Sequence, residues 1–133
     1  MAVTSVLIAG SGGRAYLAAA AFARCGIETA LIDGSATGPA DRELEHTVRA
    51  LAVDVRRGVE LIGAVDVDRH VEAELTGDRV ENFDAIVLAD APDAQRFAGL
   101  SVRVFVLGAA DDAARLVRLV RLARSKSARA IEK

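Results

Sequence analysis

Short segments dominated by apolar residues recur along the chain and predict buried strands. They cover residues 6–9, 29–32, 85–89 and 102–107. Apolar runs without regular polar alternation are typical of parallel strands, because other layers cover both faces of a parallel sheet. Glycines follow the first run directly, and Asp33 follows the second. We therefore expect a buried parallel sheet whose first strand ends in a glycine-rich turn.

Three other segments have the composition or spacing of helices. Residues 14–24 are rich in alanine, and Gly26 follows where a glycine commonly ends a helix. Residues 41–51 carry apolar side chains at spacings of four and three, which places these on one helix face. They are Leu44, Val48 and Leu51. Asp111 can N-cap a long last helix that reaches roughly Ile131.

The middle of the chain has a different pattern, which predicts an antiparallel β-meander. Three short β-rich segments, 59–67, 71–75 and 80–83, are separated by turn residues at 68–69 and 76–78. The order of elements is then β-α-β-α-β, a meander, and β-β-α. This order predicts an α/β fold, a three-layer Rossmann-like parallel sheet with a β-meander crossover. We expect a single domain over the whole chain.

Composition narrows the classes of protein that fit. The chain has 133 residues, of which 52% are hydrophobic and 27% charged, and a net charge of -2. These values suit one globular domain and give no general attraction to nucleic acid or to an anionic membrane. The single cysteine, Cys25, excludes an internal disulfide and favours a reducing, cytoplasmic location. We expect its thiol to be buried and inert. No targeting or membrane-spanning segment is visible.

The turn after the first strand fits the pattern G-x-G-x-x-A. Its residues are Gly10, Ser11, Gly12, Gly13, Arg14 and Ala15. The context strengthens the pattern, because it follows an expected strand, opens an expected helix and precedes an acid, Asp33, 18 residues beyond Ala15. This arrangement predicts a binding site for the diphosphate and ribose of a dinucleotide, with NAD(H) favoured.

Each position of the motif has a physical role in such a site. Gly10 permits the tight turn, Gly12 lets a diphosphate approach the backbone, and Ala15 lets the helix pack closely on the sheet. The N–H groups and the dipole at the helix N-terminus stabilise the phosphates, toward which Arg14 points. Asp33 accepts hydrogen bonds from the ribose hydroxyls and repels a 2′-phosphate, which favours NAD over NADP.

The same residues also have interpretations that need no ligand. A glycine-rich turn can serve packing alone in a fold that binds nothing. Asp33 can be a solvated acid at the end of a strand, and Arg14 can be a surface arginine.

A longer series of features occurs in a familiar order along nearly the whole chain. It comprises residues 6–33, 51–59, 75–79, 83–89, and 104–109 before a long helix. In this order the chain resembles the dinucleotide-binding domains of the two-domain FAD/NAD(P) flavoprotein reductases. The resemblance is closest to the C-terminal part of the trimethylamine dehydrogenase and dienoyl-CoA reductase group.

The chain departs from this family in two places. The family often has Ala-Thr-Gly after the fourth parallel strand, where this chain has Ala89-Asp90-Ala91. It often has Gly-Asp before the last helix, where this chain has Gly108-Ala109. In flavin-binding members that Asp holds part of the flavin nucleotide. The absence of that Asp counts against flavin binding by this chain. The resemblance implies a nucleotide-binding module separated from its catalytic partners, with the flavin carried by a larger flavoprotein subunit. Asp33 favours NAD(H) as the nucleotide, with ADP or FAD as alternatives.

No residue pattern predicts catalysis by this chain alone. The two histidines, His46 and His70, have no metal-ligand spacing, and we expect both on the surface. No serine has a histidine partner that the sequence can place. The last helix carries Arg115, Arg118 and Arg121 opposite an apolar face. This basic face either docks on an acidic subunit or is simply solvated.

Three functions are compatible with these observations. The leading hypothesis is an NAD(H)-binding small subunit of a flavoprotein oxidoreductase complex, not catalytic alone. The second is a structural subunit with a vestigial nucleotide site, which stabilises a larger partner. The third is a free NAD-sensing regulatory domain. A bound adenine nucleotide favours the first or third function, and a co-purifying flavoprotein separates the first from the third.

Overall fold

A parallel sheet lies at the centre of the computed structural model, which describes residues 4–35, 42–89, 104–107 and 117–118. Its strands in the described residues are β1 (Ser5–Ala9), β2 (Glu28–Asp33), β3 (Asp54–Arg57), β7 (Ala85–Ala89) and β8 (Val104–Leu107). They lie in the order β3-β2-β1-β7-β8, and every neighbouring pair is parallel. The predicted parallel sheet is therefore confirmed.

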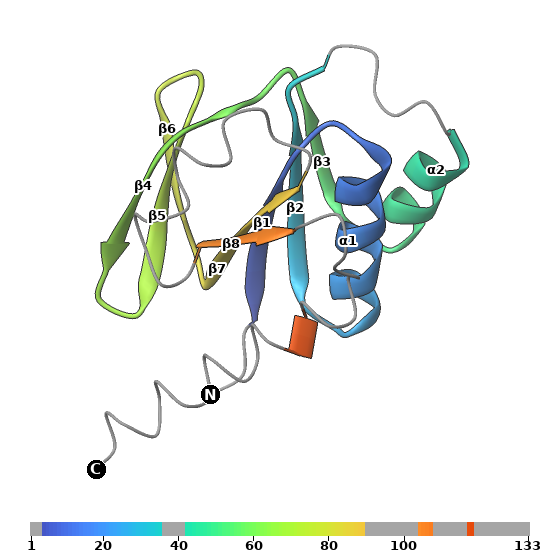
Figure 1. Cartoon of the computed structure of the whole chain (residues 1–133), viewed down its shortest axis with the longest axis horizontal. Coiled ribbons are helices and arrows are strands. Elements are labelled where there is room, and N and C mark those ends of the chain that lie inside the picture. The colour runs from blue at the N-terminus through green and yellow to red at the C-terminus, as the bar shows by residue number, and fades with distance from the viewer. Residues whose placement is uncertain (1–3, 36–41, 90–103, 108–116, 119–133) are drawn as a thin grey trace.

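The helices α1 (Gly13–Arg24) and α2 (Arg42–Ala50) lie on one face of this sheet (Figure 1). They contact each other. Side chains from alternate positions of the strands, such as Val6 and Ile8 of β1, pack with Tyr16 and Phe22 of α1 in one apolar cluster. Ala15, Ala18 and Ala19 are also fully buried, so the alanine-rich sequence lets α1 lie close to the sheet.

The β-meander covers the opposite face of the sheet, as Figure 1 shows. Its strands are β4 (Leu61–Val67), β5 (His70–Leu75) and β6 (Arg79–Phe83), paired antiparallel. Leu7 and Ala9 of β1 pack on this side, in a second apolar cluster with Leu75 and Phe83. Alternate residues of each central strand thus face different layers, which explains why β1 and β7 are apolar at nearly every position. The predicted three-layer α/β fold with a meander is confirmed.

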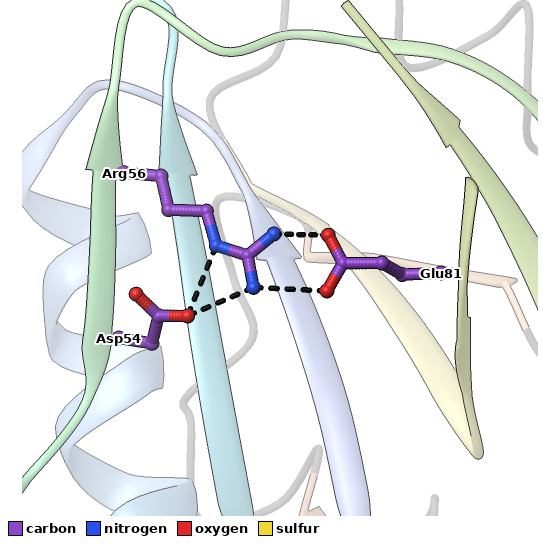
Figure 2. Close-up of polar contacts among 3 residues, drawn as sticks. All are labelled: Asp54, Arg56 and Glu81. Carbon is purple, nitrogen blue, oxygen red and sulfur yellow. Dashed lines mark hydrogen bonds and ion pairs between the residues drawn. The ribbon is translucent and has the colours of Figure 1, made fainter. Parts of the chain in front are cut away.

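The strand β3 is the part of the sheet that the apolar pattern did not locate. Its sequence, Asp-Val-Arg-Arg, contains one apolar residue, and it lies at the edge of the sheet. Figure 2 shows that Arg56 reaches from β3 to Glu81 of β6 with two hydrogen bonds. Arg56 also donates to Asp54 Oδ2 from Nη2 at 2.8 Å and from Nε at 3.0 Å. This planar fork fastens the meander to the sheet edge.

We expect the Arg56–Glu81 pair to stop stabilising the protein at low pH. Hydrogen bonds from Arg56 lower the pKa of the Glu81 carboxyl from its ordinary value of 4.5. Because the folded-state pKa lies below the unfolded value, this contribution is complete above pH 4.5 and is lost as the pH falls through the folded pKa. At neutral pH, Glu81→Gln should lower the free energy of unfolding by about 1 kcal/mol, because the pair is partly exposed. Urea unfolding across a pH series measures this effect, and a loss that stays constant into acid would contradict it.

Several other expectations concern the ends of elements. Gly26 has a φ of 77° after α1, which confirms the predicted helix-ending glycine. The expectation that Cys25 is buried is wrong: it is exposed at the C-cap of α1, beyond the helix face that packs on the sheet. Of the predicted last helix, the structure describes Val117, which is buried, and Arg118, which is exposed, both helical. Arg115 and Arg121 lie outside the described residues. Among the described residues, no helix combines the length and apolar character that crossing a membrane requires.

Candidate functional site

The glycine-rich turn connects β1 to α1 and lies beside the end of β2. The backbone N–H of Gly10 donates to the carbonyl of Ile32 at 3.1 Å. Ile32 directly precedes Asp33, the last residue of β2. The two predicted parts of the site, the turn and the acid, therefore meet at the carboxyl edge of the sheet. In parallel α/β folds this edge is where ligands commonly bind.

Gly10 is required for steric reasons rather than for its backbone angles. A Cβ on Gly10 would lie 1.5 Å from the carbonyl oxygen of Ala89, at the end of β7, and 3.1 Å from Cβ of Ala15. Among the described glycines, positive φ angles occur at Gly26, Gly58 and Gly77 and not at Gly10. The close approach of β7 thus explains this glycine, where the sequence suggested a tight turn. The fully buried Ala15 agrees with the predicted close packing of α1 on the sheet.

Gly12 is the N-cap of α1 and has an ordinary extended conformation, with φ of -91° and ψ of 172°. Any residue adopts this conformation, so backbone strain does not explain the glycine. No side chain of the described residues caps the helix, and its first turn contains no acid. Ser11 and Arg14 beside it are half-buried, and Gly13 is exposed. The first turn of α1 therefore has the composition of an anion site, because it carries no carboxylate of its own that would offset the positive end of the helix dipole.

Asp33 is fully buried, and both of its carboxylate oxygens accept hydrogen bonds. The hydroxyl of Tyr16, from α1, donates to Oδ2 at 2.6 Å. The backbone N–H of Ser35 donates to Oδ1 at 2.8 Å. The interpretation of Asp33 as a solvated acid is therefore wrong, because α1 covers the end of β2. Burial, followed by the hydrogen bond and charge of Asp33, raises the pKa of Tyr16 to about 12.

Arg57 extends this cluster toward the protein surface. It ends β3 and pairs with Asp33 in the parallel register. Its guanidinium forms an ion pair with Glu45 of α2, and its hydrogen bond and positive charge act to lower the pKa of Tyr16. Sequence reasoning missed Tyr16 and Arg57. The available signals were a tyrosine within an apolar helix face, whose hydroxyl needs a partner, and an arginine directly before Gly58.

The other candidate residues do not come together. His46 lies in α2 and His70 begins β5, so they belong to layers on opposite faces of the sheet (Figure 1). His70 Nδ1 is 3.4 Å from Asp84 Oδ1, and both histidines are exposed, as expected. Within the described part of the chain, no group of three or more histidine, cysteine or acidic residues is arranged to hold a metal ion. Asp90, Ala91, Gly108 and Ala109, where the chain departs from the flavoprotein family, lie outside the described residues.

Comparisons with known proteins identify the fold. No protein-family model matches the chain, and no curated protein matches its sequence. A solved structure of the Diels-Alderase PyrE3 of pyrroindomycin biosynthesis is similar, with a TM-score of 0.63 and 17% identity over 72% of this chain and 34% of that one. AlpK is similar with a TM-score of 0.65 and 14% identity over 74% and 34%. The E. coli flavoprotein disulfide reductase RclA is similar with a TM-score of 0.57 and 16% identity, over 65% of this chain and 21% of that one.

These similarities establish the architecture of the chain. It shares the Rossmann-like fold found in solved flavoprotein reductases, and it spans about a third or less of the length of the three structures. The predicted resemblance to flavoprotein reductase domains is thus confirmed for the fold. The specific similarity to the trimethylamine dehydrogenase and dienoyl-CoA reductase group stays a prediction.

Proposed function

We propose that this chain is an adenine-dinucleotide-binding module, with NAD(H) as its ligand, that serves a flavoprotein oxidoreductase and is not catalytic alone. The observation that carries the proposal is the N-terminus of α1 at Gly12, which no described side chain caps, in the same glycine-rich turn that meets the end of β2 next to Asp33. The fold shared with flavoprotein reductases supports it by analogy.

The diphosphate would lie against the N-terminus of α1. A helix start offers N–H groups that lack intrahelical partners, together with a partial positive charge. Natural helices commonly satisfy these groups with Ser, Thr, Asp or Asn at the N-cap. This chain has Gly12 there, in a conformation that does not require glycine. A ligand that approaches the backbone closely accounts for that choice.

Cofactor preference gives a first test of the site. We expect NADH to bind more tightly than NADPH, because the Asp33 carboxylate repels a 2′-phosphate. Asp33→Asn removes the charge but keeps an oxygen that can accept from Tyr16, and it should narrow the difference between the two cofactors. Calorimetric titration of the full chain with both cofactors measures this difference. Equal affinities in the unmodified protein would count against the role of Asp33, and failure to bind NADH, FAD or ADP would refute the nucleotide module itself.

The subunit role predicts a complex with a larger, flavin-bearing protein. Arg118 is exposed, and Val65, Val67 and Val80 are exposed apolar residues of the meander. In the strand register, these valines alternate with residues that face the central sheet, so they lie on the outer face of the meander. Exposed apolar side chains and arginine are common at protein interfaces.

We expect charge reversal of the basic face to weaken this complex. The triple change Arg115→Glu, Arg118→Glu and Arg121→Glu should slow association and change its salt dependence, because charges at an interface rim act mainly on the on-rate. Binding of the co-purified flavoprotein across a salt series measures the effect. An unchanged affinity at low salt would exclude this face. Recovery of the chain alone from its native source would refute the subunit role and favour the regulatory one.

One observation favours the second candidate, a structural subunit with a vestigial site. Asp33 is buried, and both its oxygens already accept protein hydrogen bonds. A site that had lost its ligand would keep such a carboxylate only if the protein satisfied it. Absence of binding by every adenine nucleotide, together with stable assembly on a larger partner, would identify this candidate.

A further inference from the structure

The hydrogen bond between Tyr16 and Asp33 occupies an oxygen that a bound ribose would need. The Tyr16 hydroxyl lies 2.6 Å from Oδ2, and the Ser35 N–H lies 2.8 Å from Oδ1. The side chains of Tyr16 and Asp33 are both fully buried. Hydroxyl groups of a ribose donate to a carboxylate over the same distances. Because Asp33 is fully buried, a ribose can reach its carboxylate only if a neighbouring protein group moves aside.

Of these two groups, Tyr16 is the one that can give way more readily. The Ser35 donor belongs to the backbone, whereas the Tyr16 donor is the end of a side chain. Helical side chains point back toward the helix N-terminus, which brings the Tyr16 hydroxyl from α1 to the carboxyl edge of the sheet. Arg57 is a second polar partner for this hydroxyl, since its hydrogen bond acts on Tyr16. The oxygen of this hydroxyl can thus keep Arg57 as its donor when the O–H leaves Asp33.

We propose that Tyr16 competes with the ribose of the nucleotide for Asp33, so that binding displaces the Tyr16 hydroxyl and Tyr16 sets the affinity of the site. This inference rests on the proposed nucleotide function and adds a residue that determines specificity. It predicts that ligands with a ribose are weakened by Tyr16, whereas a bare diphosphate at the N-terminus of α1 is not.

The decisive variant is Tyr16→Phe, which keeps the buried ring and removes the competing hydroxyl. We expect its affinity for ADP-ribose to be about tenfold higher than that of the unmodified chain, because a hydrogen bond to a carboxylate no longer has to be broken. Its affinity for inorganic pyrophosphate should be unchanged. This split between two ligands separates competition at Asp33 from a general change in the shape of the site.

The chain carries its own spectroscopic reporter for this event. It contains one tyrosine and no tryptophan, so its tyrosine emission reports Tyr16 alone. The fluorescence of a phenol is weak while it donates a hydrogen bond to a carboxylate. Because ADP-ribose should displace the Tyr16 hydroxyl from Asp33, it should raise the tyrosine fluorescence of the unmodified chain, and pyrophosphate should not. If Tyr16→Phe does not fold, which circular dichroism would show, this measurement decides the question.

The outcomes distinguish the inference from the function on which it rests. Tighter binding of ADP-ribose by Tyr16→Phe with unchanged pyrophosphate affinity supports the competition, as does binding by Tyr16→Phe when the unmodified chain does not bind. An unchanged or weaker affinity for ADP-ribose in Tyr16→Phe overturns the competition but leaves the nucleotide function standing. An equal gain for both ligands also overturns it. If neither protein binds ADP-ribose or pyrophosphate, the proposed function and this inference both fail.

Discussion

Gly12→Asp is expected to abolish binding of the dinucleotide while leaving the protein at least as stable. The N-cap backbone of α1 has the extended conformation that an aspartate cap adopts. The new carboxylate would accept hydrogen bonds from the first N–H groups of the helix and would interact favourably with its dipole, adding up to about 1 kcal/mol of stability. The same carboxylate would repel a diphosphate at contact distance by about 4 kcal/mol, which corresponds to a loss of affinity of about a thousandfold.

The matched control is Gly12→Asn, because asparagine caps a helix as well as aspartate and has the same shape without the charge. The difference in affinity between these two variants measures the electrostatic part of the loss. Calorimetry with ADP-ribose gives the affinities, and thermal unfolding gives the stabilities. Binding by Gly12→Asp as tight as that of the unmodified chain would place the phosphates elsewhere. A loss of stability in both variants would show that glycine is needed for the fold.

Gly10→Ala is expected to destabilise the protein by about 3 kcal/mol or more. The added methyl group would lie 1.5 Å from the carbonyl oxygen of Ala89, so either β1 or β7 must shift. Because the conflicting atom belongs to the backbone of a central strand, no side-chain rotation can relieve the contact. Overpacking that forces backbone shifts commonly costs about 1–3 kcal/mol, and a contact this short lies at the upper end. Urea unfolding of the purified variant measures the loss.

Gly13→Ala, in the same glycine-rich turn, is the control for this change. A Cβ on Gly13 would lie 3.6 Å from Cδ1 of Leu44, an ordinary van der Waals distance, and Gly13 is the first residue of α1. Alanine is a better helix former than glycine, so this variant should be as stable as the unmodified protein or slightly more stable. Equal stability of the two variants would show that the close approach of β7 does not explain Gly10.

The sequence predicted those parts of the fold whose signal is local. The strands β1 and β7, and residues 30–32 of β2, are apolar at nearly every position, because both of their faces are buried. This pattern can be recognised without knowing the neighbouring strands. The apolar pattern did not locate β3, because an edge strand that carries Arg56 and Arg57 has the composition of a surface loop. Its partners, Glu81 and Glu45, lie 25 and 12 residues away in the sequence. No local pattern contains them.

The candidate site shows the same division. The motif placed the turn and Asp33 at one edge of the sheet, because spacing along a β-α-β unit fixes both. It did not predict that Asp33 would be buried, because that depends on how far the Tyr16 side chain of α1 reaches over the end of β2. The helical pattern counts Tyr16 as apolar and ignores its hydroxyl. Likewise, the motif marked Gly10 as necessary for a tight turn, whereas the structure requires it because β7 lies close. That contact could not be predicted locally, since β7 follows Gly10 by more than 70 residues.

The strand order also constrains how the chain is assembled during synthesis. β1 pairs on one side with β2, which follows it closely, and on the other side with β7, where Val6 lies opposite Ala85. The Asp84 carboxylate accepts the N–H of Thr4 at 2.8 Å across a separation of 80 residues. As the ribosome delivers the chain from its N-terminus, β1 therefore has one edge without a partner until the whole meander has been made. Pairings this distant in sequence form slowly, and open strand edges invite other chains. We therefore expect truncated chains that stop before residue 85 to aggregate during expression, because β1 then lacks its β7 partner.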